Sequence, residues 1–548
     1  MKNTSIEKAL ILSFALLSLA FYIKTTVGEL GYTDFDDAYM ITRYAKHYLS
    51  GNGFSWNPVD GPAYGITSPA YLILITAILG LTGCSDATAL TFASFFAGLL
   101  AVLTLVLLGF VVQGGKWARK SWLPILIVPC ILLVPPFKYH SLTGMETTLS
   151  LFTNSLLCVA IAITTRRRTA STILLCLLAG FLSYSARPDN GIYSLLLPPL
   201  FFIAIDLSLW RYALTYTLLF SIVVVCSLVA DRHLFGSFLP LPFYAKASGF
   251  YQGYVGATKW NAMAEMLLFC SAALPFILVA VATAPRRTLL QLAAIGSVLA
   301  GTFAYLSTVT QIMGWNARYY YPSLSIAVWV AYVAACGRAE DGRIRLSRNT
   351  TGLRLFACVV ALLFVLSTSL RTLVTVIWEK HVIRTTAAVL PASNYRMPQD
   401  RHLPQLGWWN SVAAMSDLLE RMPRGSILAA SEYGILGSRF PGLTIVDLVG
   451  LHDSTIAHHG FSATYVCLRR PDVIWFPHAD YTWAVAEMLD NHVFQKDYDY
   501  YPGVYDYGIA LRKTSASYAN VKKEVEREFT RIYQGKNLSD YIASPPTE

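Results

Sequence analysis

The sequence predicts an α-helical polytopic membrane protein that crosses the bilayer about eleven times and ends in a C-terminal α/β domain outside the membrane. Composition is the first reason: only 14% of the 548 residues are charged, 55% are hydrophobic and the mean hydropathy is +0.47. Soluble domains carry about 25% charged residues. The second reason is that apolar segments of helical length recur up to about residue 376, and the third is that charge, His, Pro and Gly become frequent after that point.

A membrane-spanning helix needs about 20 residues, with about 17 as a practical minimum. The first apolar segment follows Lys2 and Lys8 and has no convincing cleavage site, which predicts an uncleaved anchor with a cytoplasmic N-terminus. The candidate spans are roughly 7–26, 86–112, 121–135, 147–165, 170–186, 191–206, 211–230, 263–284, 288–310, 320–337 and 354–376. A further apolar segment, 68–83, is brief and opens with Thr67-Ser68-Pro69.

The basic clusters decide whether segment 68–83 crosses, because cytoplasmic loops carry an excess of Lys and Arg. If it does not cross, all the basic clusters between spans are cytoplasmic, including Arg338–Arg354; if it crosses, most of them fall outside. We therefore predict a juxtamembrane or half-inserted helix at 68–83. The loop 27–85 and everything after residue 377 are then extracytoplasmic.

These assignments divide the chain into a transmembrane module, 1–376, and an extracytoplasmic tail, 377–548. In the tail, short β-rich runs alternate with helical stretches, which is typical of a small α/β domain. The β-rich runs are Ser426–Ala430, Leu443–Val449, Asp472–Phe476 and Tyr507–Leu511, and the helical stretches are Trp408–Arg421, Tyr481–Leu489 and Asn520–Tyr533.

Charge and residue spacing exclude several functions. The net charge is +10, but the basic residues lie in short clusters between apolar stretches and form no stripe, so we predict no nucleic-acid partner. The polar loops lie on the outer face, where ATP and nucleotide sugars are not available. No His or Cys pattern has metal-site spacing, and we predict no cofactor and no required metal.

The most informative feature is the acidic cluster Asp34-Phe35-Asp36-Asp37, directly after the first apolar segment. A carboxylate at a membrane face is costly unless it is solvated, paired or used. The next residues, Met40–Leu49, have helical spacing with one apolar side, which favours a helix on the bilayer surface. Further along the loop, Trp56 and Asn57 offer the aromatic face and amide that a sugar ring requires. An interfacial aromatic belt explains the same residues, and both interpretations stay open.

Three cations lie on the outer face although the positive-inside rule disfavours them there: Arg187, Lys246 and Arg318. Each alone is also explained as an anchor that reaches the membrane surface. Together with the acidic cluster they suit a site that binds a lipid phosphate beside a carboxylate base. A sugar on such a phosphate is activated, because cations stabilise the leaving group while one carboxylate deprotonates an acceptor hydroxyl. Single displacement inverts the anomeric centre.

An ordered series of motifs resembles the GT-C glycosyltransferases, the polytopic class that uses polyprenyl-phosphate sugars. Within that class the chain most resembles the terminal arabinofuranosyltransferase group of bacterial cell-wall synthesis. The motifs are Asp36-Asp37-Ala38-Tyr39, Arg43-Tyr44-Ala45, Trp56-Asn57-Pro58, Gly65-Ile66-Thr67-Ser68-Pro69, Gly144-Met145-Glu146-Thr147, Arg187-Pro188-Asp189, Pro242-Phe243-Tyr244-Ala245-Lys246, Arg318-Tyr319 and Val446-Asp447-Leu448-Val449-Gly450-Leu451-His452-Asp453.

The resemblance implies roles for these residues. Asp36 resembles the catalytic base and Asp37 its neighbour, but which of the two is the base stays open. Lys246, Arg187 and Arg318 resemble donor-phosphate ligands. The implied substrate pocket contains Tyr39, Arg43, Trp56, Asn57, Thr67, Glu146 and Tyr244. Arg43 has the alternative of pairing with the acidic cluster.

The resulting prediction is an inverting glycosyltransferase of the bacterial cytoplasmic (inner) membrane, with its active site and tail on the extracytoplasmic side. It moves a sugar, arabinofuranose by resemblance, from a polyprenyl phosphate to a glycan, lipid or protein. A hexosyl or aminoarabinosyl transferase fits the same residues. A flippase of lipid-linked sugars is the alternative from another class, but it predicts ionisable residues in mid-span, which are nearly absent.

Overall fold

The computed structural model describes residues 2–113, 123–133, 135–247, 265–266, 269, 288–309, 311, 314–336, 408–477 and 481–534. The chain forms two compact units. The first comprises Met1–Phe35, Ser68–Ala230 and Gly256–Ile383, and the second comprises Asp36–Thr67, Asp231–Val255 and Arg384–Glu548. The predicted boundary at 376/377, the predicted span 354–376 and nearly all of 263–284 lie outside the described residues.

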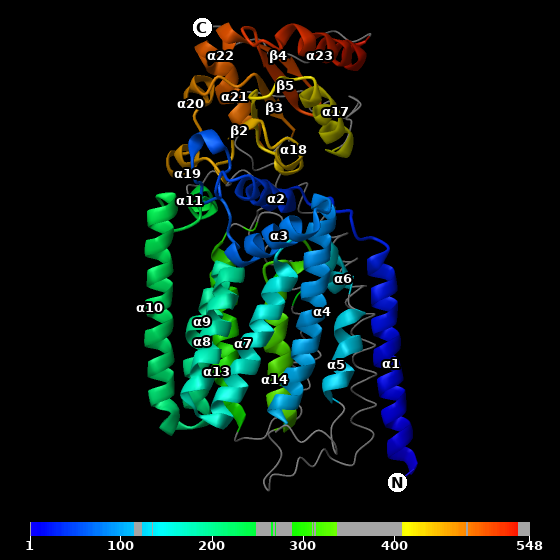
Figure 1. Ribbon diagram of the computed structural model, residues 1–548, viewed down its shortest axis with the longest axis vertical. Helices are drawn as coiled ribbons and strands as arrows, with labels where there is room; N and C mark the ends of the chain where they lie inside the picture. Colours follow the sequence, from blue (N-terminus) through cyan, green and yellow to red (C-terminus); the bar gives the residue numbers. More distant parts are fainter. Residues whose placement is uncertain are drawn as a thin grey trace, which may run out of the picture. The chain divides into compact units, whose positions relative to one another are not determined.

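The first unit is a bundle of helices (Figure 1). Its helices are α1 (Lys2–Val27), α3 (Pro69–Thr82), α4 (Asp86–Val112), α5 (Leu123–Leu132), α6 (Pro135–Leu142), α7 (Thr147–Arg167), α8 (Ala170–Ala186), α9 (Gly191–Ile205), most of α10 (Trp210–Phe235), α13 (Leu289–Thr308) and α14 (Leu324–Cys336). In the described part of the chain, six helical segments are long and apolar enough to cross a membrane, or seven if the bent pair α5 and α6 is one span. Most of α7 is buried, whereas α1 and α10 expose most of their apolar side chains on opposite sides of the bundle.

Helix α3 shows why segment 68–83 stays short. The Ser68 hydroxyl accepts a hydrogen bond from the backbone N–H of Tyr71, and Pro69 occupies the first turn, so the helix starts there. Gly83 ends it in the left-handed conformation, with φ of 62°. Fourteen residues give about 21 Å of helix, less than the roughly 30 Å hydrocarbon core. Its length agrees with the predicted juxtamembrane helix.

The second unit is built on a five-stranded sheet in the order β2-β1-β3-β5-β4. The strands are β1 (Ile427–Ala430), β2 (Thr444–Asp447), β3 (Val473–Phe476), β4 (Tyr498–Pro502) and β5 (Gly508–Arg512). Strand β1 pairs in parallel with β2 and β3, and β5 pairs antiparallel with β3 and β4. The predicted α/β domain is confirmed; β4, a tyrosine-rich run, was not among the predicted strands.

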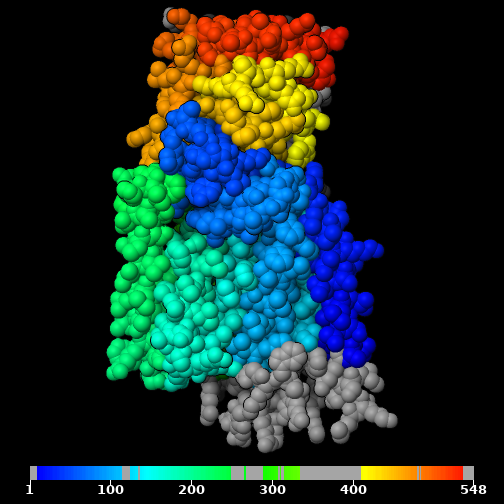
Figure 2. Space-filling model, in the orientation of Figure 1, coloured from blue at the N-terminus to red at the C-terminus, as the bar shows by residue number. Residues whose placement is uncertain are grey.

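Nine helices accompany this sheet in the described part of the unit. They are α2 (Asp36–Leu49), α11 (Leu241–Ala247), α17 (Trp408–Glu420), α18 (Gly434–Arg439), α19 (Ser454–His459), α20 (Ala463–Leu468), α21 (Thr482–Asp490), α22 (His492–Asp497) and α23 (Tyr518–Tyr533). Three of them match the helical stretches predicted for the tail, and α2 and α11 come from the N-terminal half of the chain. Figure 2 shows one face of the chain as a space-filling model, in the orientation of Figure 1.

Helix α2 belongs to the second unit, and its apolar side, which was predicted to face the bilayer surface, packs against protein. Its Met40, Ile41 and Tyr44 side chains are buried, and α2 packs against α18. Arg43, fully buried, donates five hydrogen bonds within this unit: to the carbonyls of Trp56, Gly437, Phe440 and Leu443 and to Oδ1 of Asn57. An apolar helix face that suits lipid is here used to bind a protein domain.

We expect Arg43→Lys to destabilise the second unit by about 3 kcal/mol, because an ammonium group has three donors and leaves buried carbonyls unsatisfied. The change is measured as a lower melting temperature of the full chain in nanodiscs. Arg439→Lys, at a half-exposed arginine of the same unit, is the matched control and should leave the melting temperature within about 1 °C. Equal melting temperatures for the two variants would contradict the assigned role of Arg43.

Candidate functional site

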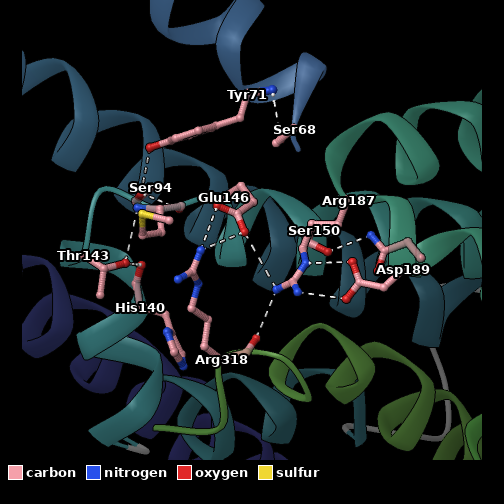
Figure 3. A network of polar contacts seen from close by, with 12 residues as sticks. Ser68, Tyr71, Ser94, His140, Thr143, Glu146, Ser150, Arg187, Asp189 and Arg318 are labelled. Atoms are coloured by element: carbon pink, nitrogen blue, oxygen red, sulfur yellow. Dashed lines mark hydrogen bonds and ion pairs between the residues drawn. The ribbon is translucent and has the colours of Figure 1, made fainter. Parts of the chain in front are cut away.

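Three predicted site residues of the first unit meet at the ends of its helices. Glu146 directly precedes α7, after a turn at Gly144 with φ of 73°. Arg187 ends α8, and Arg318 follows the short helix Trp315–Ala317. We call Glu146, Arg187, Asp189 and Arg318 the cation cluster (Figure 3).

The cation cluster is buried and tightly paired. Arg187 donates from Nε to Oδ1 of Asp189 over 3.1 Å and from Nη2 to Oδ2 over 2.8 Å. Its Nη1 lies 3.8 Å from Oε1 of Glu146. Nη2 of Arg318 lies 3.2 Å from Oε1 and 3.5 Å from Oε2 of the same carboxylate. Glu146, Arg187 and Arg318 each expose less than a tenth of their surface. Two of the three predicted phosphate ligands, Arg187 and Arg318, therefore lie together, next to Glu146 of the predicted substrate pocket.

The charges in the cation cluster balance: two guanidinium groups face two carboxylates. Burial alone would raise the pKa of Glu146, but Arg318 and Arg187 outweigh it and hold that pKa below its usual value. Burial alone would lower the pKa of Arg187, but Asp189 and Glu146 raise it. Glu146 and Arg187 are therefore both charged at neutral pH. Buried arginines with fork geometry suit a phosphate, which offers the same oxygen pairs as the carboxylates.

The two candidate bases differ sharply in their surroundings. Asp36 is 2% exposed, and its two oxygens accept hydrogen bonds from the backbone N–H groups of Gly434 (2.7 Å) and Ile435 (2.8 Å) at the start of α18. Burial raises the pKa of Asp36 to about 6, although these two bonds lower it and Asp37 raises it further. Asp37 is half-buried and Asp34 is exposed.

The other predicted pocket residues also belong to the second unit. Trp56 is buried and stacks on His452 with ring centroids 4.1 Å apart, with the Arg43 guanidinium 4.8 Å from the Trp56 ring. The Asn57 side chain donates from Nδ2 to the carbonyl oxygen of Ile445 and accepts at Oδ1 the backbone N–H of the same residue. These contacts hold the first loop to the sheet, and a role for these three residues in substrate binding stays a prediction.

The remaining predicted residues are more accessible. Tyr39, Thr67, Tyr244 and Lys246 are partly exposed. The Tyr244 ring lies 4.3 Å from that of His458, between α11 and α19. Lys246 is on α11 of the second unit, so it was predicted with the two arginines but folds in the other unit.

Sequence reasoning missed two residues of the first unit. Asp189 was quoted only as part of a motif, yet it is the bidentate partner of Arg187; its position two residues after an arginine was the available signal. His140 is buried beside Arg318 (Figure 3), and the sequence gives no sign of this. Among the described residues, no group of three or more His, Cys, Asp or Glu side chains is arranged to hold a metal ion.

The solved structures include proteins of similar fold. No family model and no curated protein matches the sequence. ArnT from Cupriavidus metallidurans in the apo state aligns with a TM-score of 0.51 and 12% identity, over 92% of this chain and 98% of that chain. The same protein bound to undecaprenyl phosphate aligns with a TM-score of 0.50 and 13% identity over the same shares. At this identity the likeness shows the fold: the chain has the polytopic GT-C fold with a C-terminal α/β domain.

We expect Glu146→Gln to destabilise the first unit by about 3 kcal/mol at neutral pH, because it leaves two buried guanidinium groups with one carboxylate. A carboxyl group whose pKa is lower in the folded state stabilises above its unfolded value, 4.5, and this contribution fades as the pH falls below that value. The difference in melting temperature between the wild type and the variant should therefore shrink from pH 7 to pH 4.

The matched control for Glu146→Gln is Glu29→Gln, which removes an exposed ion pair with Lys138 in the same unit. We expect it to change the melting temperature little at either pH. A difference for Glu146→Gln that is constant from pH 7 to pH 4 would show that its charge does not stabilise the fold.

Proposed function

We propose that the protein is a membrane glycosyltransferase that moves a sugar from a polyprenyl phosphate to an acceptor hydroxyl with inversion. The observation that carries the proposal is the cation cluster, in which two buried arginines share a carboxylate at the helix ends of a GT-C fold. Phosphate oxygens can replace the carboxylate oxygens on these guanidinium groups. A protein of the same fold has been solved with undecaprenyl phosphate bound, which supports this donor class.

The reaction then needs two groups. A carboxylate takes the proton of the acceptor hydroxyl while the acceptor oxygen bonds to the anomeric carbon. The bond from that carbon to the phosphate oxygen breaks, and the electron pair leaves with the polyprenyl phosphate. The arginines stabilise the charge that develops on the leaving phosphate. No step requires a metal, and we propose that turnover survives EDTA.

We propose Asp37 as the base and Asp36 as the residue that positions it. Both carboxylate oxygens of Asp36 accept hydrogen bonds from backbone N–H groups at the start of α18, and the residue is almost fully buried. Asp37 follows it on the first turn of α2 and is partly exposed. An acceptor hydroxyl must come within about 3 Å of the base, which favours the accessible carboxylate.

The substrate and location follow the resemblance. We propose an arabinofuranosyl donor and an extracytoplasmic glycan, lipid or protein acceptor, in the bacterial inner membrane. Lys246 is proposed as a third phosphate ligand, and Tyr244 with Tyr39 and Thr67 as pocket residues. A hexosyl or aminoarabinosyl donor requires the same cation cluster and base, so the donor is decided by measurement.

We expect Asp37→Asn to lower kcat by about 10²- to 10⁴-fold, as loss of a general base does, with an unchanged melting temperature. Asp36→Asn should instead lower the melting temperature, because an amide can accept only one of the two backbone hydrogen bonds. Turnover is measured as polyprenyl phosphate released in nanodiscs. The opposite pattern, with turnover lost and stability kept in Asp36→Asn, would make Asp36 the base.

The donor is identified with a panel of polyprenyl-phosphate sugars, tested with envelope extracts as acceptor and with the Asp37→Asn variant as control. We expect the arabinofuranosyl donor to be consumed by the wild type alone. Consumption of another sugar would keep the mechanism and change the substrate. Movement of lipid-linked sugar across the bilayer without consumption of any donor would assign the protein to transport instead.

A further inference from the structure

The backbone directly before Arg318 is strained. Asn316 and Ala317 have φ values of 56° and 61°, in the left-handed region that residues with a side chain rarely adopt. Two such residues in succession cost free energy and persist only when their surroundings hold them. Because Arg318 is the next residue, this turn decides where its guanidinium points.

Two side chains hold the strained turn: that of His140, which is fully buried, and that of Glu265, which is half-buried. His140, on α6, donates from Nε2 to the carbonyl oxygen of Asn316 over 2.8 Å, and Glu265 accepts the backbone N–H of Ala317 over 2.5 Å. The His140 ring is fully buried and lies 4.7 Å from that of Tyr321, between centroids. Figure 3 shows His140 next to Arg318.

The second ring nitrogen of His140 distinguishes it from a simple packing residue. A carbonyl only accepts, so Nε2 carries the hydrogen and Nδ1 of the neutral ring is an acceptor. Nδ1 is buried and has no hydrogen-bond partner among the described residues. An unsatisfied buried nitrogen costs stability, and the hydrogen bond from Nε2 to Asn316 is what this position gains from a histidine.

We propose that His140 is a positioning residue of the cation cluster: its Nε2–H bond to Asn316 fixes the strained turn so that Arg318 faces Glu146 and the donor phosphate. This inference rests on the proposed function, because it assigns the phosphate to Arg318. His140 itself need not touch the donor. Its effect on donor binding passes through Arg318.

The test measures the Kd of undecaprenyl phosphate, against undecaprenol, for purified full-length protein. His140→Gln and His140→Asn differ by one methylene group: the Gln amide can reach the Asn316 carbonyl, and the shorter Asn amide cannot. We expect His140→Asn to weaken binding about tenfold, the equivalent of one hydrogen bond of about 1.4 kcal/mol. His140→Gln should stay within about twofold of the wild type.

A double-mutant cycle separates positioning from general destabilisation. If His140 acts through Arg318, the double variant His140→Asn with Arg318→Ala binds no more weakly than Arg318→Ala alone. Tyr22→Phe is the matched control, because it removes a buried 2.7 Å hydrogen bond to Ser141, the next residue of α6, without touching the turn. It should lower the melting temperature and leave the Kd unchanged.

Three results would overturn the proposal. They are additive effects of His140→Asn and Arg318→Ala, an unchanged Kd in His140→Asn, and a loss of binding in His140→Gln as large as in His140→Asn. Each of these leaves the proposed function intact if the wild type prefers undecaprenyl phosphate to undecaprenol. A wild type without that preference would overturn the proposed function and this inference together.

Discussion

The second unit depends on the carboxylate of Asp36, which comes from the N-terminal part of the chain and binds the C-terminal part within this unit. Helix α18 begins shortly after β1, and the side chain of its N-cap residue, Tyr433, accepts no hydrogen bond from the first backbone N–H groups of the helix. Asp36 supplies the missing acceptors from a position 398 residues earlier. Gly434 permits the approach, since a Cβ there would lie 2.0 Å from the Asp36 carbonyl oxygen. The first loop and the tail are therefore parts of one folded body, and the acidic motif is placed by the tail.

This explains why residues so far apart in the sequence form one series of motifs. Asp447, in the tail motif, accepts the backbone N–H groups of Val449, Gly450 and His452 and so shapes the turn after β2. That turn presents His452 to the Trp56 ring of the first loop. Several residues that carry the resemblance thus join the loop to the tail, whereas Glu146, Arg187 and Arg318 form the cation cluster in the first unit.

The sequence predicted what depends on composition and local pattern. Apolar length located most of the described spanning helices, and Ser68-Pro69 with Gly83 marked a helix too short to span. It could not assign the apolar face of α2, because Met40 and Tyr44 suit lipid and a protein core equally well. The sequence also could not show that Arg43 donates hydrogen bonds to four backbone carbonyls, since these partners lie up to 400 residues away. Arg187 and Arg318 were singled out because positive charge is disfavoured on the outer face, to which the predicted topology assigned them.

The charge balance of the cation cluster decides which arginine can respond to a ligand. Simple attraction to a cluster of balanced charges is weak, so in the proposed function a phosphate replaces carboxylate oxygens on a guanidinium group. Arg187 is held by Asp189 with bonds of 2.8 and 3.1 Å, whereas the closest oxygens of Glu146 lie 3.2 and 3.5 Å from Arg318. Exchange is therefore easier at Arg318, with Arg187 as the fixed partner. In the proposed function, the direction of Arg318 is then the variable on which phosphate binding depends, and the strained turn held by His140 and Glu265 fixes that direction.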